Sequence, residues 1–246
     1  MNILLVNDDG YKAQGINTLD EVLTEHGHNI YVVAPATEQS GKSNSMTVGG
    51  SVIAREYKKN RYYLTGSPAD CIIFPFRSGL VNNIDLVVSG INHGYNVSTD
   101  IIYSGTCGAA RQATMYGLKA IAISTDREKG ESEFNFRGAA EFLAENLELF
   151  ASKIKGETFL NINTPACFSG YELADLGAID YRDEVSLKRE DNGDIKLEFA
   201  GITASYRTFK RKHRADFEVT RDKKAALSFI DIHQHISYPH MESFNG

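Results

Sequence analysis

Short apolar strand patterns alternate with amphipathic helix patterns in the first half of the chain, and this alternation constrains the fold most. The strand patterns lie at residues 2–6, 29–34, 86–89 and 120–124, and the helix patterns at 16–25, 68–74, 106–116 and 136–150. Successive strands joined by helices build a parallel sheet, because each helix carries the chain back along one face of the sheet. We therefore expect an α/β fold with a Rossmann-like, mostly parallel sheet and helices on both faces.

The second half of the chain has a different texture. A strand pattern at 159–163 is followed by β-like segments at 180–188, 195–199 and 216–219, and Asp191-Asn192-Gly193-Asp194 is a strong turn signal between two of them. We expect residues 1–157 to form the α/β core that carries the functional site. Residues 158–246 are expected to form a β-rich extension that acts as an oligomerisation arm, since its strand edges need covering.

Composition excludes several classes of protein. The 246 residues carry a formal net charge of −6, which argues against a nucleic-acid polymer as the main partner. No apolar run approaches the roughly 20 residues that span a bilayer, and a secretory signal pattern is absent, so we expect no membrane partner. Cys71, Cys107 and Cys167 are odd in number and widely spaced, as expected of buried, reduced thiols in a cytoplasmic protein.

Two adjacent carboxylates, Asp8 and Asp9, follow the first strand pattern directly. The carboxyl ends of parallel strands are where α/β sheets bind ligands. Neighbouring carboxylates repel each other, so they are stable side by side only when well solvated or when a cation lies between them. Two interpretations are therefore open: a site for a hard divalent metal, or a solvated turn in which Asp9-Gly10 reverses the chain.

Polar residues also follow the next strand patterns. The loop after the second strand contains Ser40 and Asn44, and the third strand leads into Asn92 and Asn96. Tyr103-Ser104-Gly105-Thr106 then opens a helix pattern whose free backbone N–H groups can bind an anion. Together these groups describe oxygen ligands for a hard metal beside a phosphate-binding pocket, although each one alone is more often an ordinary polar loop or a helix cap.

Five segments of the sequence resemble the SurE family, the survival protein E or stationary-phase 5′-nucleotidases. The segments are Asn7-Asp8-Asp9-Gly10, Ala34-Pro35 with Ser40-Gly41, Gly66-Ser67-Pro68-Ala69-Asp70-Cys71, Ser89-Gly90-Ile91-Asn92 and Tyr103-Ser104-Gly105-Thr106. The resemblance implies a metal-dependent phosphatase that hydrolyses nucleoside 5′-monophosphates. It also implies a homodimer or homotetramer in which C-terminal arms are exchanged between subunits.

The resemblance assigns roles to individual residues. It implies that one Mg²⁺ or Mn²⁺ ion per subunit is held by Asp8, Asp9, Ser40 and Asn92. It implies a phosphate pocket lined by Asn96, Ser104, Gly105 and Thr106, and we add Asn44 from the polar loop to these substrate-binding residues. Asp8 and Asp9 are the predicted catalytic residues, with water attacking the phosphorus atom directly.

One other mechanism and two other functions remain as alternatives. A phosphoenzyme route with Asp8 as the nucleophile is less favoured, because the Asp-x-Asp-x-Thr arrangement of haloacid-dehalogenase phosphatases is absent from the sequence. A dinucleotide-binding oxidoreductase is weaker still, since no Gly-x-Gly-x-x-Gly follows the first strand. A non-catalytic nucleotide or polyphosphate sensor that acts through oligomerisation is the alternative of a different class.

Overall fold

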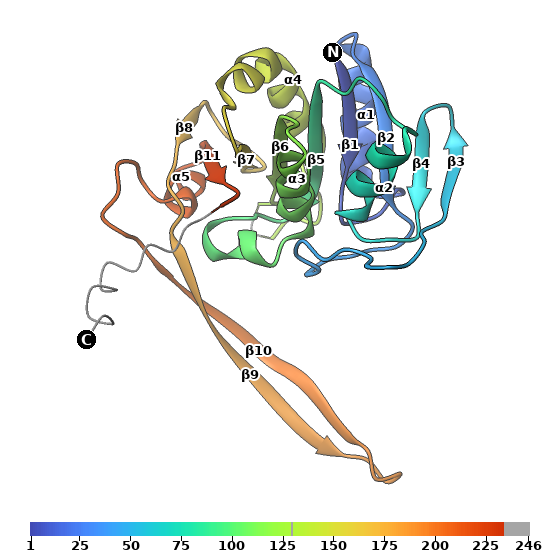
Figure 1. Ribbon diagram of the computed structural model, residues 1–246. Helices are drawn as coiled ribbons and strands as arrows, with labels where there is room; N and C mark the ends of the chain where they lie inside the picture. Colours follow the sequence, from blue (N-terminus) through green and yellow to red (C-terminus); the bar gives the residue numbers. More distant parts are fainter. Residues whose placement is uncertain (129, 234–246) are drawn as a thin grey trace, which may run out of the picture.

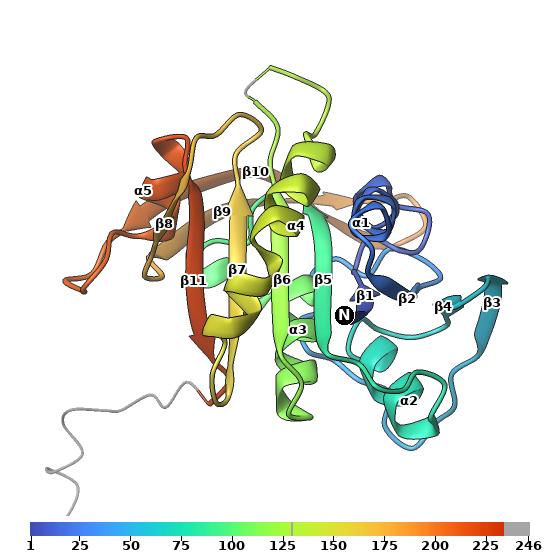
Figure 2. The same ribbon diagram turned by 90° about the horizontal axis from the view of Figure 1, so that it is seen from above.

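A mixed sheet forms the centre of the computed structural model, which describes residues 1–128 and 130–233 (Figure 1). Its nine strands run in the order β3-β4-β2-β1-β5-β6-β7-β11-β8 and lie side by side from β8 to β3 in Figure 2. Two neighbouring pairs, β3–β4 and β11–β7, are antiparallel, and the other neighbouring pairs are parallel. The strands are β1 (Asn2–Val6), β2 (Asn29–Pro35), β3 (Ala54–Lys58), β4 (Arg61–Leu64), β5 (Leu86–His93), β6 (Ala120–Thr125), β7 (Thr158–Thr164), β8 (Tyr171–Leu173) and β11 (Ala225–Asp231).

Helices cover both faces of this sheet. α1 (Gln14–Glu25) and α4 (Phe136–Lys153) pack with Ile3 and Leu5 in one buried cluster. α2 (Asp70–Ser78) and α3 (Gly105–Met115) lie in the cluster of the opposite face. β1 is apolar from Ile3 to Val6 because both of its faces are buried there. The predicted α/β class with a mostly parallel sheet is confirmed. None of the helices in the described ranges is long and apolar enough to cross a membrane.

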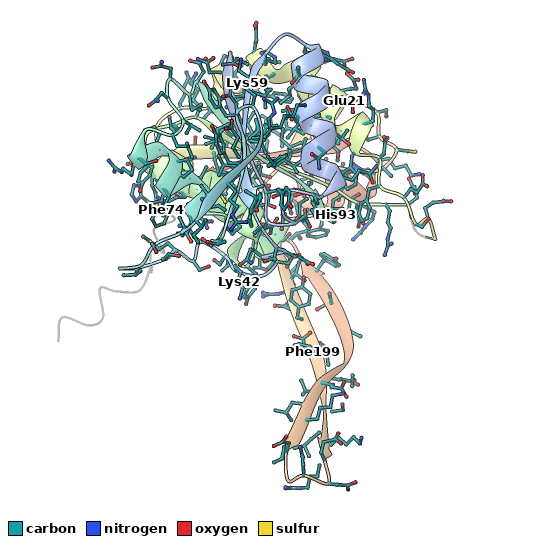
Figure 3. The ribbon with its side chains drawn as sticks, turned by 90° about the vertical axis from the view of Figure 1, so that its right-hand side faces the viewer. Glu21, Lys42, Lys59, Phe74, His93 and Phe199 are labelled. Carbon is teal, nitrogen blue, oxygen red and sulfur yellow. The ribbon has the colours of Figure 1, made fainter. Side chains whose placement is uncertain are left out.

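The segment after residue 157 divides between the sheet and a separate hairpin. β7, β8 and β11 join the sheet, whereas β9 (Ala178–Arg189) and β10 (Ile195–Arg207) pair only with each other. This hairpin, which we call the arm, projects from one end of the body (Figure 1). In Figure 3, Phe199 lies on the arm, while His93 and Lys42 lie at the end of the body from which the arm departs. The final part of the predicted extension, 234–246, lies outside the described residues.

Two expectations from the sequence are wrong. Residues 216–219 are not a strand but part of α5 (Asp216–Arg221), because the Glu218 carboxylate accepts a hydrogen bond from the Ala215 N–H at 3.0 Å and starts a helix there. The alternating Phe217 and Val219 imitate a strand over so short a segment. Cys71 and Cys107 are buried as expected, but Cys167 is exposed.

The carboxyl end of β5 contains a bulge that changes the direction of the strand. The register between β5 and β6 shifts between Ser89 and Asn92, where β5 has one extra residue. Gly90 allows this, since its φ is +142° and a Cβ there would lie 2.2 Å from the Ile123 carbonyl oxygen. β1 lies between β2 and β5 at the point where the strand order reverses, and ligands bind at such points in α/β sheets.

We expect Gly90→Ala to lower the free energy of unfolding by about 3 kcal/mol or more, because backbone strain and steric overlap add together. Gly117→Ala is the matched control. Gly117 also has a positive φ, +76°, but its added Cβ would meet nothing within 4 Å. That variant should lose only about 1 kcal/mol. Urea denaturation measures both values, and equal losses would contradict this account of the bulge.

Candidate active site

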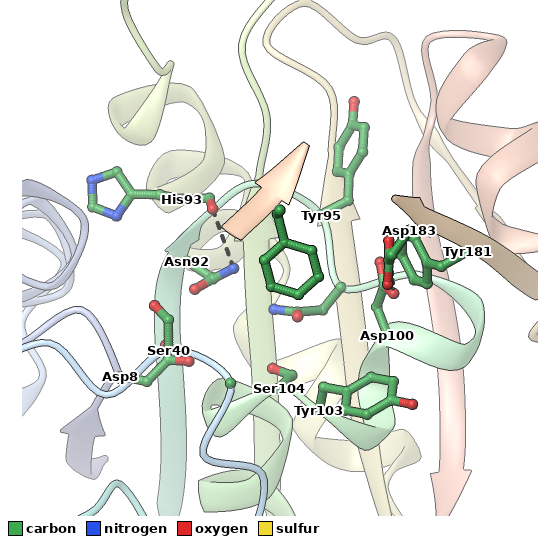
Figure 4. Close-up of a pocket in the computed structure, with 13 residues that line it drawn as sticks. Asp8, Ser40, Asn92, His93, Tyr95, Asp100, Tyr103, Ser104, Tyr181 and Asp183 are labelled. Atoms are coloured by element: carbon green, nitrogen blue, oxygen red, sulfur yellow. Dashed lines mark hydrogen bonds between the residues drawn. The ribbon is translucent and has the colours of Figure 1, made fainter. Parts of the chain in front are cut away.

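A cavity of about 610 Å³ opens at the carboxyl ends of β1 and β5, between the body and the base of the arm (Figure 4). One part of its wall is made of small polar groups and the histidine: Asp8, Ser40, Gly41, Asn92, His93, Asn96 and Ser104. The other part contains the larger rings and two more carboxylates: Tyr95, Asp100, Tyr103, Tyr181, Asp183 and Phe199. A cavity of this size can hold a small organic ligand with one strongly polar end.

Asp8 lies directly after β1 and is almost completely buried, with 3% of its surface exposed. The Thr106 hydroxyl donates a 2.5 Å hydrogen bond to Asp8 Oδ1, and the Gln39 N–H donates to the Asp8 carbonyl at 2.7 Å. Burial raises the pKa of Asp8, and repulsion from Asp9 adds to this, while the Thr106 hydrogen bond acts in the opposite direction. The Gln39 contact holds the loop that carries Ser40 close to Asp8.

Asp9 pairs with His93 through one of its oxygens. His93 Nδ1 lies 3.0 Å from Asp9 Oδ1, and the ring meets Phe134 and Phe136 edge to face. This hydrogen bond is the main reason that the pKa of His93 is raised. The second oxygen, Asp9 Oδ2, is buried and has no hydrogen-bond partner among the described residues. Leaving a buried carboxylate oxygen unpaired costs free energy, so this atom is suited to a cation ligand.

The four predicted metal ligands present a set of oxygen donors. Figure 4 shows Asp8, Ser40 and Asn92 on the same side of the cavity. The Asn92 amide donates to the Gly94 carbonyl at 2.9 Å, and its Oδ1 lies 3.3 Å from the Thr106 hydroxyl, with a lone pair left for a cation. The Ser40 hydroxyl donates to Glu38 at 2.9 Å. Carboxylate, amide and hydroxyl oxygens suit Mg²⁺ or Mn²⁺. Within residues 1–128 and 130–233, no group of three or more His, Cys, Asp or Glu side chains that could hold a metal ion is found.

The N-terminus of α3 closes the inner end of the site. The Ser104 side chain caps the helix by accepting a 3.0 Å hydrogen bond from the Cys107 N–H. Gly105 lies so close to Asp8 that an added Cβ would come within 2.8 Å of the carboxylate. Only glycine fits here without moving the carboxylate. The first backbone N–H groups of α3 therefore lie next to Asp8, where they can bind an anion held by the same site.

The predicted residues differ in how they reach the cavity. Five of them line it directly: Asp8, Ser40, Asn92, Asn96 and Ser104. Thr106 and Gly105 contact Asp8, and Asp9 reaches the wall through His93. Asn44 is not among the lining residues, and its Oδ1 is buried without a hydrogen-bond partner in the described part of the chain. A direct contact between Asn44 and substrate stays a prediction.

The base of the arm adds residues that were not predicted from the sequence. The Tyr181 hydroxyl donates to Asp100 at 2.6 Å, and Thr99 and Ile179 exchange hydrogen bonds of 3.0 and 3.1 Å. These contacts bring Tyr181, Asp183 and Phe199 to the cavity wall. Nothing in the local sequence pattern indicates that an arm residue lies against the end of β5.

The fold and the site define a class: an α/β protein with hard oxygen donors and an anion-binding helix N-terminus at the switch point of a mostly parallel sheet. Comparison with known families agrees with this. The family model described as "Survival protein SurE" matches residues 3–183. The chain belongs to the SurE family.

Individual relatives match most of the chain. It is 37% identical over 209 residues to the 5′-nucleotidase SurE of Clostridium botulinum strain 657 (Type Ba4), covering 80% of this chain and 82% of that protein. The corresponding protein of strain Eklund 17B (Type B) is 38% identical over 205 residues, covering 79% and 81%. The crystal structure of the SurE protein from Aquifex aeolicus superposes with a TM-score of 0.81 at 28% identity, covering 99% and 98% of the two chains.

The His93–Asp9 pair gives a pH-dependent prediction for the metal-free protein. We expect the pKa of His93 to lie above 6.5 in EDTA and to fall in Asp9→Asn, which loses the negative charge beside the ring. Because this folded-state pKa is raised, the stability that His93 adds is complete below 6.5 and is lost as the pH rises through the raised value.

NMR titration of the histidine ring signals measures this directly. His28 is the internal control, since burial and the chain N-terminus lower its pKa and Asp9 is not among the causes. An unchanged pKa of His93 in Asp9→Asn would show that the pair does not form in solution.

Proposed function

We propose that the chain is a divalent-metal-dependent phosphomonoesterase that hydrolyses nucleoside 5′-monophosphates to nucleoside and phosphate. The names of its Clostridium botulinum relatives, each called 5′-nucleotidase SurE, support this reaction. The observation that carries the proposal is the buried Asp9 Oδ2 without a partner in the described chain, next to Asp8 and near the N-terminus of α3. A cation ligand beside an anion-binding helix end is the arrangement that phosphoryl hydrolysis needs.

The donor set fits one Mg²⁺ or Mn²⁺ ion per subunit, held by Asp8, Asp9, Ser40 and Asn92. Such an ion, when bound, polarises a phosphoryl oxygen and lowers the pKa of water. The protein's own contribution is to hold these oxygens in place: Thr106 orients Asp8, and His93 orients Asp9. One of the two carboxylates accepts the proton of the attacking water.

The N-terminus of α3 binds the phosphate group itself. The backbone N–H groups at Gly105 and Thr106, with the Ser104 hydroxyl, donate to the phosphoryl oxygens, which carry negative charge throughout the reaction. Because these donors are fixed by the helix, they need no reorganisation during the reaction. Asn96 supplies a further polar group on the neighbouring wall.

The nucleoside is held beside the aromatic part of the cavity wall. Tyr95, Tyr103, Tyr181 and Phe199 all contribute rings to this wall. Aromatic rings stack on any nucleobase, so this wall favours a nucleotide over a free phosphate ion without requiring one particular base. The sensor alternative would use the same wall, but it leaves the metal-ligand oxygens without a chemical role.

We also propose that the arm joins subunits in a homodimer or homotetramer. Its exposed apolar side chains include Val185, Leu187, Ile195 and Leu197, with 48–63% of their surface exposed. Apolar groups gathered on a projecting hairpin are typical of a surface that another chain covers. Two further statements remain predictions. Residues 1–157 form the core and the arm is the assembly element, and the protein is located in the cytoplasm.

Phosphate release tests the reaction. Wild-type protein should release inorganic phosphate from nucleoside 5′-monophosphates with Mg²⁺ or Mn²⁺ and not with EDTA. We expect Asp9→Asn to lower kcat/KM by at least about 100-fold, since electrostatic stabilisation of the transition state is lost. Asp191→Asn, at the exposed tip of the arm, is the matched control. Metal-independent release, or full activity of Asp9→Asn, would contradict the assigned metal site.

Assembly through the arm is tested separately. The double variant Leu187→Ser with Leu197→Ser removes two exposed apolar side chains from facing positions of the hairpin. We expect light scattering to show a smaller species than the wild type at the same concentration. Lys188→Ser with Lys196→Ser, at the adjacent facing pair, should leave the mass unchanged. A monomeric wild-type protein would refute the proposal.

A further inference from the structure

Asn96 is held by two asparagine side chains of β7, Asn161 and Asn163. The Asn96 N–H donates to Asn163 Oδ1 at 2.8 Å, and Asn163 Nδ2 donates back to the Asn96 carbonyl at 3.0 Å. Asn161 Nδ2 donates to the same carbonyl at 2.8 Å. The Asn163 side chain thus binds both polar groups of the Asn96 backbone, in the way that a neighbouring strand would.

Both asparagines are fully buried, with none of their surface exposed. Residues two apart on a strand share a face, so the side chains of Asn161 and Asn163 point in the same direction from β7. The remaining oxygen, Asn161 Oδ1, lies 3.6 Å from the Cys107 sulfur in α3. Burying two amides is favourable only when they are hydrogen-bonded, and here each one is used to hold residue 96.

Asn96 lies in the irregular segment between β5 and the short 3-10 helix at Ser98–Ile102. This segment is fixed by side chains at two points. Besides the asparagines at residue 96, the buried Asp216 carboxylate accepts hydrogen bonds from the Ser98 N–H at 2.6 Å and from the Ser98 hydroxyl at 2.8 Å. The backbone that carries Asn96 is therefore set by residues that come much later in the chain.

The side chain of Asn96 is also oriented. Its Nδ2 donates a 2.9 Å hydrogen bond to the Ser124 hydroxyl, and the residue lines the cavity. An amide NH₂ group carries two hydrogens, so Ser124 uses one of them and holds the amide in place. The second hydrogen can donate to a phosphate oxygen.

We propose that Asn163 is a positioning residue, which fixes the Asn96 backbone so that the Asn96 amide meets the phosphate group of the substrate; this rests on the proposed function. Asn163 does not line the cavity, so it acts only through Asn96. Asn161 assists it at the Asn96 carbonyl. In this way β7, a strand that is buried behind the site, contributes to substrate binding.

A double-mutant cycle tests the proposal. We expect Asn163→Ala to lower kcat/KM for a nucleoside 5′-monophosphate by about 10-fold, as for a misplaced hydrogen bond to a charged group. In the Asn96→Ala background the same change should alter kcat/KM by less than about 2-fold, since the group that it positions is gone. Equal losses in the two backgrounds would overturn the proposal.

Ile162→Ala is the matched control for stability. Ile162 lies between the two asparagines on the same strand, but its side chain packs in the core on the opposite face. This variant should lower the midpoint of urea unfolding and leave kcat/KM within about 2-fold of the wild type. If it lowered kcat/KM as much as Asn163→Ala, the effect of Asn163 would be a general effect of stability.

Asn163→Asp replaces Asn163→Ala in the double-mutant cycle if Asn163→Ala does not fold. It keeps the oxygen that accepts from the Asn96 N–H and loses the group that donates to the Asn96 carbonyl. We expect a loss of kcat/KM in this variant that is again absent in the Asn96→Ala background. A loss of the same size in both backgrounds would count against the proposal.

A further readout does not depend on turnover. In metal-loaded protein, inorganic phosphate should shift the NMR signal of the Asn96 side-chain NH₂ group in the wild type, and Asn163→Ala should weaken phosphate binding. A wild type that binds phosphate without hydrolysing any nucleotide would refute the proposed function. Weaker phosphate binding by Asn163→Ala would support the positioning role in that case too. Phosphate binding that is unaffected by Asn163→Ala would refute the positioning role alone.

Discussion

The hydrogen bond from Thr106 to Asp8 is the interaction around which the rest of the site is arranged. It joins the end of β1 to the first turn of α3 across the buried edge of the sheet. A carboxylate in such a place is unfavourable unless donors or a cation compensate its charge. Gly105 allows the helix to approach closely enough, and the backbone of Asp8 in turn holds the loop that carries Ser40. The fold therefore brings the predicted cation ligands and the predicted anion donors together by a single close contact.

Much of this could be predicted from local patterns. β1 is apolar from Ile3 to Val6 because helices cover both of its faces, and the polar residues that follow, Asp8 and Asp9, therefore had to lie at the sheet edge. The same argument applies to Asn92, near the carboxyl end of β5. Periodicity also located α1, α3 and α4, whose bounds differ from the expected ones by a few residues at most. These features depend on neighbours in sequence, which is why the sequence reveals them.

Other parts depend on contacts between distant residues. Tyr181 and Phe199 reach the cavity because the base of the arm contacts the segment that contains Asp100. The strand pattern of β7 predicts that Asn163 is in a strand, but not that its side chain binds the backbone of Asn96. α5 was mistaken for a strand because two alternating apolar residues fit both periods. For Tyr181 and Asn163 the deciding partner lies 81 and 67 residues away, respectively.

The arm has a consequence for the concentration dependence of the protein. Its base forms part of the wall of the cavity, while its outer strands expose apolar side chains to solvent. In the proposed oligomer, the subunit that covers those side chains also restrains the rings of the cavity wall. Dilution of that oligomer would therefore act on the apolar part of the hairpin and on the shape of the cavity together.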